Sequence, residues 1–157
     1  ISTGSMEGYS WLQGRYPQTE EGNTFLIMRR SAKRPNVVRQ TIKGLEPGRL
    51  YSLKMFTGDH QDLSVKQEHA VSLELQGVEV IPDNCFQHVF ANCYGHYSGR
   101  YDASRSAWMN FYWRVFRAKS SEAVLRISDW ASEAEPGGPI GQELMFNFVE
   151  VQPYFAE

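Results

Sequence analysis

Two runs of alternating polar and apolar residues, separated by a turn, constrain the fold more than any other part of the chain. The first run covers residues 37–43 and the second covers residues 51–55. A period of two is typical of half-buried strands, because successive side chains of a strand point to opposite faces. Between the runs, Pro47 fixes its own φ and Gly48 accepts a positive φ, which is the chemistry of a tight turn. The pattern predicts two β-strands and excludes a helix here.

Similar runs recur along the rest of the chain and predict an all-β protein. Strands are expected at 24–30, 70–76, 85–91, 108–118, 122–130 and 145–151, with 78–81 continuing a strand past a bulge at Gly77. This number and spacing of short strands favour a two-sheet antiparallel β-sandwich of the jelly-roll type. The apolar positions expected in its core are Val71, Leu73, Leu75, Leu125, Ile127, Val149 and Val151.

Length and charge limit the classes of partner. The 157 residues suit a single sandwich domain spanning 1–157. Lys and Arg total 16 against 18 Asp and Glu, a net charge of −2, so nucleic acid is not the expected partner. No apolar run approaches the roughly 20 residues that cross a bilayer.

A local basic cluster is interpreted as a solvated strand end and loop; it consists of Arg29, Arg30, Lys33, Arg34 and Arg39. Because the chain opens at Ile1 without an initiator methionine, we expect a module attached to other domains of a larger protein.

The order of several short motifs resembles a family of carbohydrate-binding modules with the galactose-binding-like jelly-roll fold. The matching segments are Gly4-Ser5-Met6-Glu7 with Trp11, residues 22–26, Gln40, 45–48, 51–53, 116–118, 123–127 and 147–151. The resemblance covers almost the whole chain. It implies a sandwich fold and a non-catalytic module of a secreted or cell-surface protein that binds a glycan. Sandwiches of this fold also bind proteins or have no known ligand, so the alternative is a structural or protein-interaction domain without a sugar site.

The resemblance also implies a structural calcium ion near Glu7 and the closing strand. Many relatives carry Asp in that strand, where this chain has Asn147. Calcium prefers carboxylate oxygens, and a neutral amide is a weaker ligand. The alternative is that Glu7 and Asn147 only hydrogen-bond the ends of the first and last strands. No other cofactor is expected.

The aromatic segment 108–116 is the strongest candidate for a binding face. Alternation places Trp108, Asn110, Tyr112 and Arg114 on one face, and Met109, Phe111, Trp113 and Val115 on the other. We assign the apolar set to the core and the mixed set to a sugar-binding face, because rings cover the apolar face of a sugar while planar polar groups pair its hydroxyls. Phe116 shares the parity of the mixed set yet matches a core position of the family. A bulge near Arg114 would swap the assignment.

Three other rings are binding candidates. Trp130 ends the strand expected at 122–130, and Tyr97 and Tyr101 lie in a Gly-rich loop, where packing within the loop is the alternative.

Catalysis is not expected. The chain has no Gly-x-Ser-x-Gly elbow, no phosphate-binding loop and no opposed carboxylates of the kind that glycoside hydrolysis needs.

The two cysteines, Cys85 and Cys93, leave three alternatives open: a disulfide, two free buried thiols, or a metal site with His88 and His96, whose spacing is poor for zinc. A disulfide would require an oxidising compartment.

Overall fold

The computed structural model describes residues 1–6, 8–10, 21–93 and 106–156. Strands form most of the regular structure, and the short 3₁₀ turns include η2 (Glu21–Asn23) and η3 (Pro82–Asn84). Within these ranges no helix has the length and apolar character needed to cross a membrane.

The strands agree with the predicted segments to within a few residues at each end. Their bounds are β1 (Ser2–Ser5), β2 (Thr24–Arg29), β3 (Val37–Lys43), β4 (Leu50–Asp59), β5 (Ser72–Gln76), β6 (Val78–Val80), β7 (Phe86–Cys93), β8 (Ser106–Ala118), β9 (Glu122–Ser128) and β10 (Glu143–Pro153). The short β1 was not predicted as a strand.

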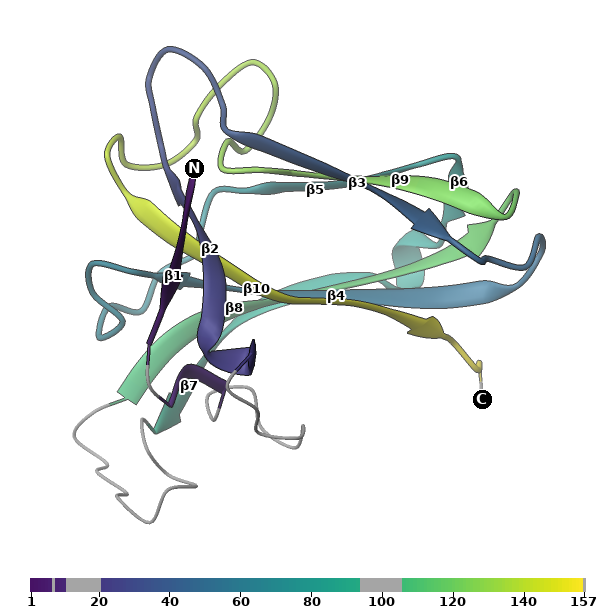
Figure 1. The fold of residues 1–157 in the computed structure, drawn as a ribbon, viewed down its shortest axis with the longest axis horizontal. Helices are drawn as coiled ribbons and strands as arrows, with labels where there is room; N and C mark the ends of the chain where they lie inside the picture. The colour runs from purple at the N-terminus through teal and green to yellow at the C-terminus, as the bar shows by residue number, and fades with distance from the viewer. Residues whose placement is uncertain (7, 11–20, 94–105, 157) are drawn as a thin grey trace.

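The strands form two antiparallel sheets that face each other, which confirms the predicted β-sandwich (Figure 1). The larger sheet has the order β1-β2-β10-β4-β8-β6, and β7 also pairs with β8. The smaller sheet has the order β3-β9-β5. Because β8 is long, its two halves take different partners, β7 along residues 106–113 and β6 along residues 116–118.

Two apolar clusters hold the fold together. The first lies between the sheets and joins residues of β4, β8 and β10 to Ala123, Leu125 and Ile127 of β9. The second lies on the opposite, outer face of the larger sheet and includes Phe56 and Met109. A sheet with apolar residues on both faces explains why residues 108–116 carry large rings on both sides of the strand.

The predicted core is largely confirmed. Leu125 and Ile127 are buried, and the half-buried Val71, Leu73, Leu75 and Val151 pack against the inner cluster. Val149 is an exception, because it is 41 % exposed.

A bulge in β10 explains the exposure of Val149. Asn147 pairs with Phe56 and Glu150 with Lys54, so β10 has one more residue than β4 over this interval. Phe148 adopts a left-handed φ of 54°, and its backbone N–H donates to Asn147 Oδ1 at 2.6 Å. The extra residue inverts the alternation of the strand after Asn147, which the sequence pattern does not reveal.

The turn at Pro47-Gly48 does not close a hairpin, because β3 and β4 belong to different sheets. Gly48 has the expected positive φ of 87°, but its N–H donates to Ala118 O at 2.7 Å and Leu45 N–H donates to Ser121 O. The chain therefore crosses between the sheets beside the β8–β9 connection. The same correction applies at Gly77, which turns the chain from β5 in the smaller sheet to β6 in the larger one instead of forming a bulge in one strand.

Candidate functional site

The orientation of β8 is the reverse of the predicted one. Tyr112 is only 2 % exposed and belongs to the cluster between the sheets, and Asn110 is buried as well. The pairing of β8 with β4 is continuous from Leu50 opposite Arg117 to Gly58 opposite Met109, so no bulge causes the reversal. Phe116 faces the core, as its position in the resembled family implies. Alternation alone could not decide the orientation, since both faces of the strand carry large rings.

The polar atoms of Tyr112 and Asn110 serve the fold. Tyr112 Oη bonds Thr57 Oγ1 at 3.2 Å and donates to His69 O at 3.4 Å. Asn110 Oδ1 accepts the N–H of His69, and its Nδ2 donates to Gln67 O. Burial raises the pKa of Tyr112 to about 12. These two side chains fix the segment between β4 and β5 and present nothing to a ligand.

The other predicted binding residues do not gather at one place. Trp130 is 7 % exposed and its Nε1 donates to Ser31 O, so it packs under the β2–β3 connection. Arg114 is half-buried at the edge of the larger sheet, where Nη1 donates to Phe86 O and Nη2 donates to Gln87 Oε1. Tyr97 and Tyr101 lie outside the described residues.

The strand register defines three rows of side chains that cross the outer face of the larger sheet. The rows, each running from β7 through β8 and β4 to β10, are Phe86, Trp113, Lys54, Glu150; then His88, Phe111, Phe56, Asn147; then Phe90, Met109, Gly58, Met145. Neighbouring strands lie about 4.8 Å apart, so one row extends over roughly 14 Å. The first two rows are aromatic toward β7 and polar toward β10.

Four rings form what we call the aromatic strip: Phe86, His88, Phe111 and Trp113. Phe86 is 48 % exposed, His88 is exposed and the other two are half-buried. The ring planes of Phe86 and Trp113 are 23° apart with centroids at 6.2 Å, and those of Phe86 and His88 are 16° apart at 5.8 Å. Soluble proteins rarely leave such a group of large rings open to solvent without a binding role. The strip is therefore the best candidate for a ligand surface.

The strip is closed at one end. Asn84 of η3 donates to Tyr154 Oη at 3.2 Å, although β8 and β4 lie between these two segments in the sheet. Alternation places Tyr154 on the outer face, so this bond passes over that face. The outer positions Val115 and Ser52, beyond the first row, are accordingly buried. At this end, a ligand on the strip therefore cannot extend past the row of Trp113.

A charged pair completes the first row. Lys54 Nζ lies 2.7 Å from Glu150 Oε2; the side chain of Lys54 is 6 % exposed and that of Glu150 is 35 % exposed. Glu150 also accepts a hydrogen bond from Gln152 Nε2. Burial alone would raise the pKa of the Glu150 carboxyl, but the hydrogen bonds from Lys54 and Gln152 bring it below its usual value. The carboxylate is therefore ionised and partly open to solvent.

A second polar cluster, centred on Arg30, lies inside the sandwich. Arg30 is 1 % exposed, and its guanidinium donates to Asp129 O, Pro139 O, Ala70 O and Gln142 Oε1. Interpreting Arg30 as part of a solvated basic cluster was therefore wrong. Because these donors join the segments before β5 and after β9, the cluster holds the fold and offers no open surface.

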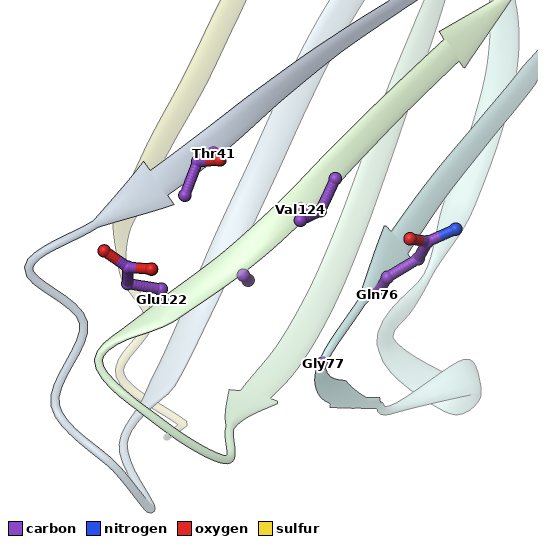
Figure 2. Close-up of a pocket in the computed structure, with 6 residues that line it drawn as sticks. Thr41, Gln76, Gly77, Glu122 and Val124 are labelled. Atoms are coloured by element: carbon purple, nitrogen blue, oxygen red, sulfur yellow. The ribbon is translucent and has the colours of Figure 1, made fainter.

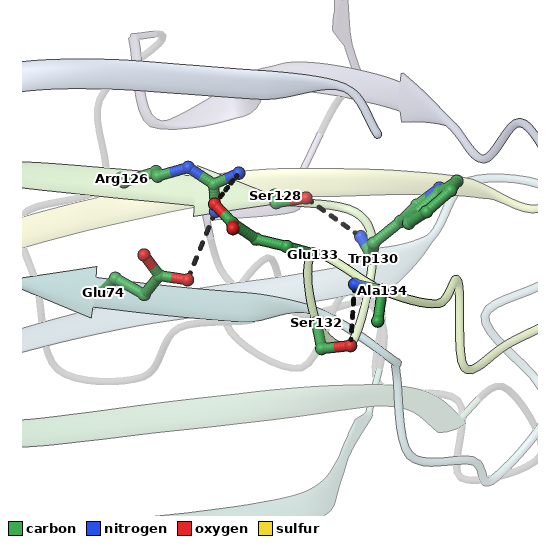
Figure 3. Close-up of polar contacts among 7 residues, drawn as sticks. All are labelled: Glu74, Arg126, Ser128, Trp130, Ser132, Glu133 and Ala134. Carbon is green, nitrogen blue, oxygen red and sulfur yellow. Dashed lines mark hydrogen bonds and ion pairs between the residues drawn. The ribbon is translucent and has the colours of Figure 1, made fainter. Parts of the chain in front are cut away.

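Arg126, on the outer face of the smaller sheet, has a comparable structural role. It is 5 % exposed and lies between Glu74 Oε1 at 3.2 Å and Glu133 Oε1 at 3.6 Å (Figure 3). Glu133 belongs to the β9–β10 connection, so the ion pairs fasten this connection to the sheet.

A shallow depression is another candidate surface among the described residues. It has a volume of about 240 Å³ and lies over the smaller sheet (Figure 2); its lining consists of Thr41, Gln76, Gly77, Glu122, Ala123 and Val124. None of these residues carries a ring on which a ligand could stack. The depression is a poorer candidate than the aromatic strip.

The disulfide alternative for the two cysteines is wrong. Cys85 is free, and its Sγ donates to Ile81 O at 3.2 Å. Cys93 ends β7, and the strand from Phe86 to Cys93 spans roughly 23 Å. Bridged cysteines keep their Cα atoms within about 7 Å. In the described ranges no group of three or more His, Cys, Asp and Glu side chains could hold a metal ion.

The side chain of Asn147 already satisfies the backbone groups around it. Its Nδ2 donates to Gly22 O at 3.1 Å and to Thr24 O, and its Oδ1 accepts the N–H of Phe148. An aspartate could not donate these bonds, and a cation beside the two carbonyls would compete with the amide for them. The second residue implied by the family, Glu7, lies outside the described residues. The donor set formed by Asn147 and its neighbours thus does not call for calcium.

We therefore expect chelation to leave the melting temperature of the protein unchanged within about 1 °C. The measurement is differential scanning calorimetry of the protein dialysed against EDTA, compared with the same protein in millimolar CaCl₂. A rise of several degrees with calcium would contradict this expectation, because a ligand that binds only the folded state raises its stability.

No protein-family model, curated protein or solved structure matches the chain.

Proposed function

We propose that the protein is a non-catalytic carbohydrate-binding module whose site is the aromatic strip with the polar ends of its rows. The observation that carries the proposal is the group of exposed and half-buried rings on the outer face of β7 and β8. As part of the same proposal, the protein is a module of a larger secreted or cell-surface protein.

The chemistry of the rows suits a sugar. Aromatic rings pack against the C–H faces of pyranoses, and the neighbouring charged and amide groups pair with hydroxyls. Trp113 brings both together, because it pairs with Phe86 on one side and with Lys54 on the other. Since the surface is open, we expect dissociation constants in the range of about 1 μM to 1 mM, or roughly 4–8 kcal/mol of binding free energy.

The test is isothermal titration calorimetry at pH 7 with cellohexaose, xylohexaose, mannohexaose and laminarihexaose. For whichever of these binds, Trp113→Ala and Phe86→Ala should each weaken binding about tenfold, because each removes roughly 1–2 kcal/mol of ring contact. Phe155→Ala is the matched control, since Phe155 is 78 % exposed and its ring lies after β10 beside Arg49, which is not part of the strip. Equal affinities of wild type, Trp113→Ala and Phe86→Ala would remove the strip from the site.

The alternative function is a structural or protein-interaction domain with no sugar site. One observation favours it: Tyr112 and Trp130, two rings expected to contact sugar, are buried. If none of the four oligosaccharides binds the wild-type protein at millimolar concentration, the alternative is preferred.

A further inference from the structure

The bulge in β10 places a carboxylate where a ligand on the aromatic strip would meet it. In regular pairing after Asn147, Val149 would lie opposite Lys54, and Glu150 would lie opposite Leu53, which is fully buried between the sheets. The extra residue instead moves Glu150 to the outer face, opposite Lys54. The left-handed φ of 54° at Phe148, a bulky residue, is an unfavourable conformation that the bulge requires.

The pair of charges is unusual in its surroundings. Lys54 lies between Trp113 and Glu150 in the first row, and its side chain is 6 % exposed. Replacing a buried ion pair by apolar residues of similar volume is often neutral or stabilising, because a buried charge such as that of Lys54 loses its contacts with water. The pair is therefore weak evidence for a purely stabilising role, and its position beside Trp113 points to a role in binding.

The two partners are not equally accessible. The Glu150 side chain is 35 % exposed, so its carboxylate can be reached from solvent, whereas the ammonium of Lys54 lies beneath the surface. The carboxylate of Glu150 has about four lone-pair positions, two on each oxygen. One oxygen contacts Lys54 and the other accepts a hydrogen bond from Gln152, so each oxygen uses one position. The positions left over can accept hydrogen bonds from hydroxyl groups.

We infer that Glu150 is the residue that selects for hydroxyl-bearing neutral glycans on the strip, accepting hydrogen bonds from two hydroxyls of the sugar next to the one that packs on Trp113, and that Lys54 positions it. This inference rests on the proposed function. A ligand in the first row then runs across the strands, from the rings on β7 and β8 toward β10. Uronic acids are rejected at this position, because their carboxylates meet the negative charge of Glu150.

The first arm of the test compares Glu150→Gln and Glu150→Ala with Trp113→Ala and wild type, by calorimetric titration of cellohexaose and xylohexaose at pH 7. Both Glu150 variants should bind about tenfold more weakly, because each removes a charged hydrogen-bond acceptor. Their melting temperatures should stay within 2–3 °C of the wild type, roughly what a change at a partly exposed residue produces.

The second arm tests Lys54 as a positioning residue. Lys54→Met should weaken binding, and Lys54→Arg should restore most of it, because arginine keeps the positive charge beside Glu150. The dependence of affinity on pH is a second readout, because it would not change if Lys54 only supported the fold. Without the lysine, the pKa of Glu150 rises, so the affinity of Lys54→Met should fall at a higher pH than that of the wild type.

Among the described residues, the neighbours of Glu150 other than Lys54 do not produce such a pH effect. Gln152 on its own strand and Trp113 and Val115 on β8 do not titrate in this range. His88 is the nearest titratable ring in the aromatic strip, and it lies on β7, three strands from β10 in the neighbouring row. His88→Gln in the Lys54→Met background should leave the shifted pH profile in place.

The outcomes separate the two proposals. If Trp113→Ala loses affinity while both Glu150 variants bind as the wild type does, the role of Glu150 is wrong and the glycan site stands. If the wild type binds neither oligosaccharide nor the other two neutral hexasaccharides, the proposed function fails, and the inference fails with it. Loss of binding accompanied by a fall of more than about 5 °C in the melting temperature of Glu150→Gln would assign Glu150 to the fold instead.

Discussion

Replacing Arg30 with methionine should lower the free energy of unfolding by about 3–5 kcal/mol, the usual cost of removing one partner from a buried charged network. For a protein of 157 residues this corresponds to a melting temperature roughly 10 °C lower. The measurement is urea-induced unfolding at pH 7, followed by tryptophan fluorescence and confirmed by calorimetry.

The size of this effect follows from what the guanidinium contacts. Nε donates to Asp129 O at 2.7 Å, Nη2 donates to Ala70 O at 2.6 Å, and Nη1 donates to both Gln142 Oε1 and Pro139 O. Methionine fills a similar volume but leaves these acceptors without a donor inside the protein. The free energy of unfolding then falls by the desolvation penalty of the unsatisfied acceptors, which is larger than the net contribution of the hydrogen bonds. The packing is close, since a Cβ built at Gly138 would lie 2.7 Å from Arg30 Nη1.

Two variants make the Arg30 result specific. Arg34→Met changes an exposed arginine of the same basic cluster and should alter stability by no more than about 0.5 kcal/mol. Arg30→Lys keeps the charge but loses the planar set of guanidinium N–H donors. Its free energy of unfolding should therefore lie between those of the wild type and Arg30→Met. An unfolding free energy for Arg30→Met within 1 kcal/mol of the wild type would show that the network does not hold the β9–β10 connection.

Arg30 also shows where reasoning from sequence stops. Five basic residues within eleven positions indicate a solvated surface, and Lys33, Arg34 and Arg39 are indeed exposed. Arg30 differs because the chain turns there, and the carbonyls that surround it come from segments 40 and 99 or more residues away. Contacts of such long range leave no local pattern to read.

The strands could be predicted because alternation is a local property, but their partners could not. Residues 37–43 and 51–55 have the expected strand pattern, yet they belong to different sheets. Pro47 and Gly48 make a tight turn in either arrangement, so the turn chemistry does not distinguish a hairpin from a crossover. The same limit applied to Gly77.

The candidate site depended on one binary choice that the sequence left open. Residues 108–116 divide into two faces, and the sequence identified both sets correctly. Tyr112 and Asn110 looked more suited to a sugar, but their polar atoms are needed inside to bond Thr57, His69 and Gln67. Phe111 and Trp113 are therefore left on the outer face. The core position of Phe116 in the resembled family was the signal that could have settled the choice.

Acidification should destabilise the protein through His69. This ring is buried, and its Nδ1 lies 2.7 Å from Thr57 Oγ1. Burial, with a smaller contribution from the charge of Arg30, lowers its pKa from 6.5 to about 4, although Asp59 acts in the opposite direction. The folded state therefore keeps the neutral ring over a range in which the unfolded chain binds a proton.

The sign of the effect follows from proton linkage. Above pH 6.5 the ring is neutral in both states and imposes no penalty. As the pH falls from 6.5 toward 4, His69 becomes protonated in the unfolded state but stays neutral in the folded state, so the free energy of unfolding decreases. With a folded pKa of about 4 the expected loss between pH 7 and pH 4.5 is about 2.5 kcal/mol.

The variant His69→Gln isolates this contribution. It should be less stable than the wild type at pH 7, because it changes a packed ring that bonds Thr57. Its stability should nevertheless fall less between pH 7 and pH 4.5, by about 2.5 kcal/mol, since glutamine binds no proton. The carboxylates that titrate in the same range are common to both proteins and cancel in the difference. Parallel stability-against-pH curves for the two proteins would mean that His69 already titrates in the folded state as it does in the unfolded chain. In that case, its bond to Thr57 opens readily enough for water to reach the ring.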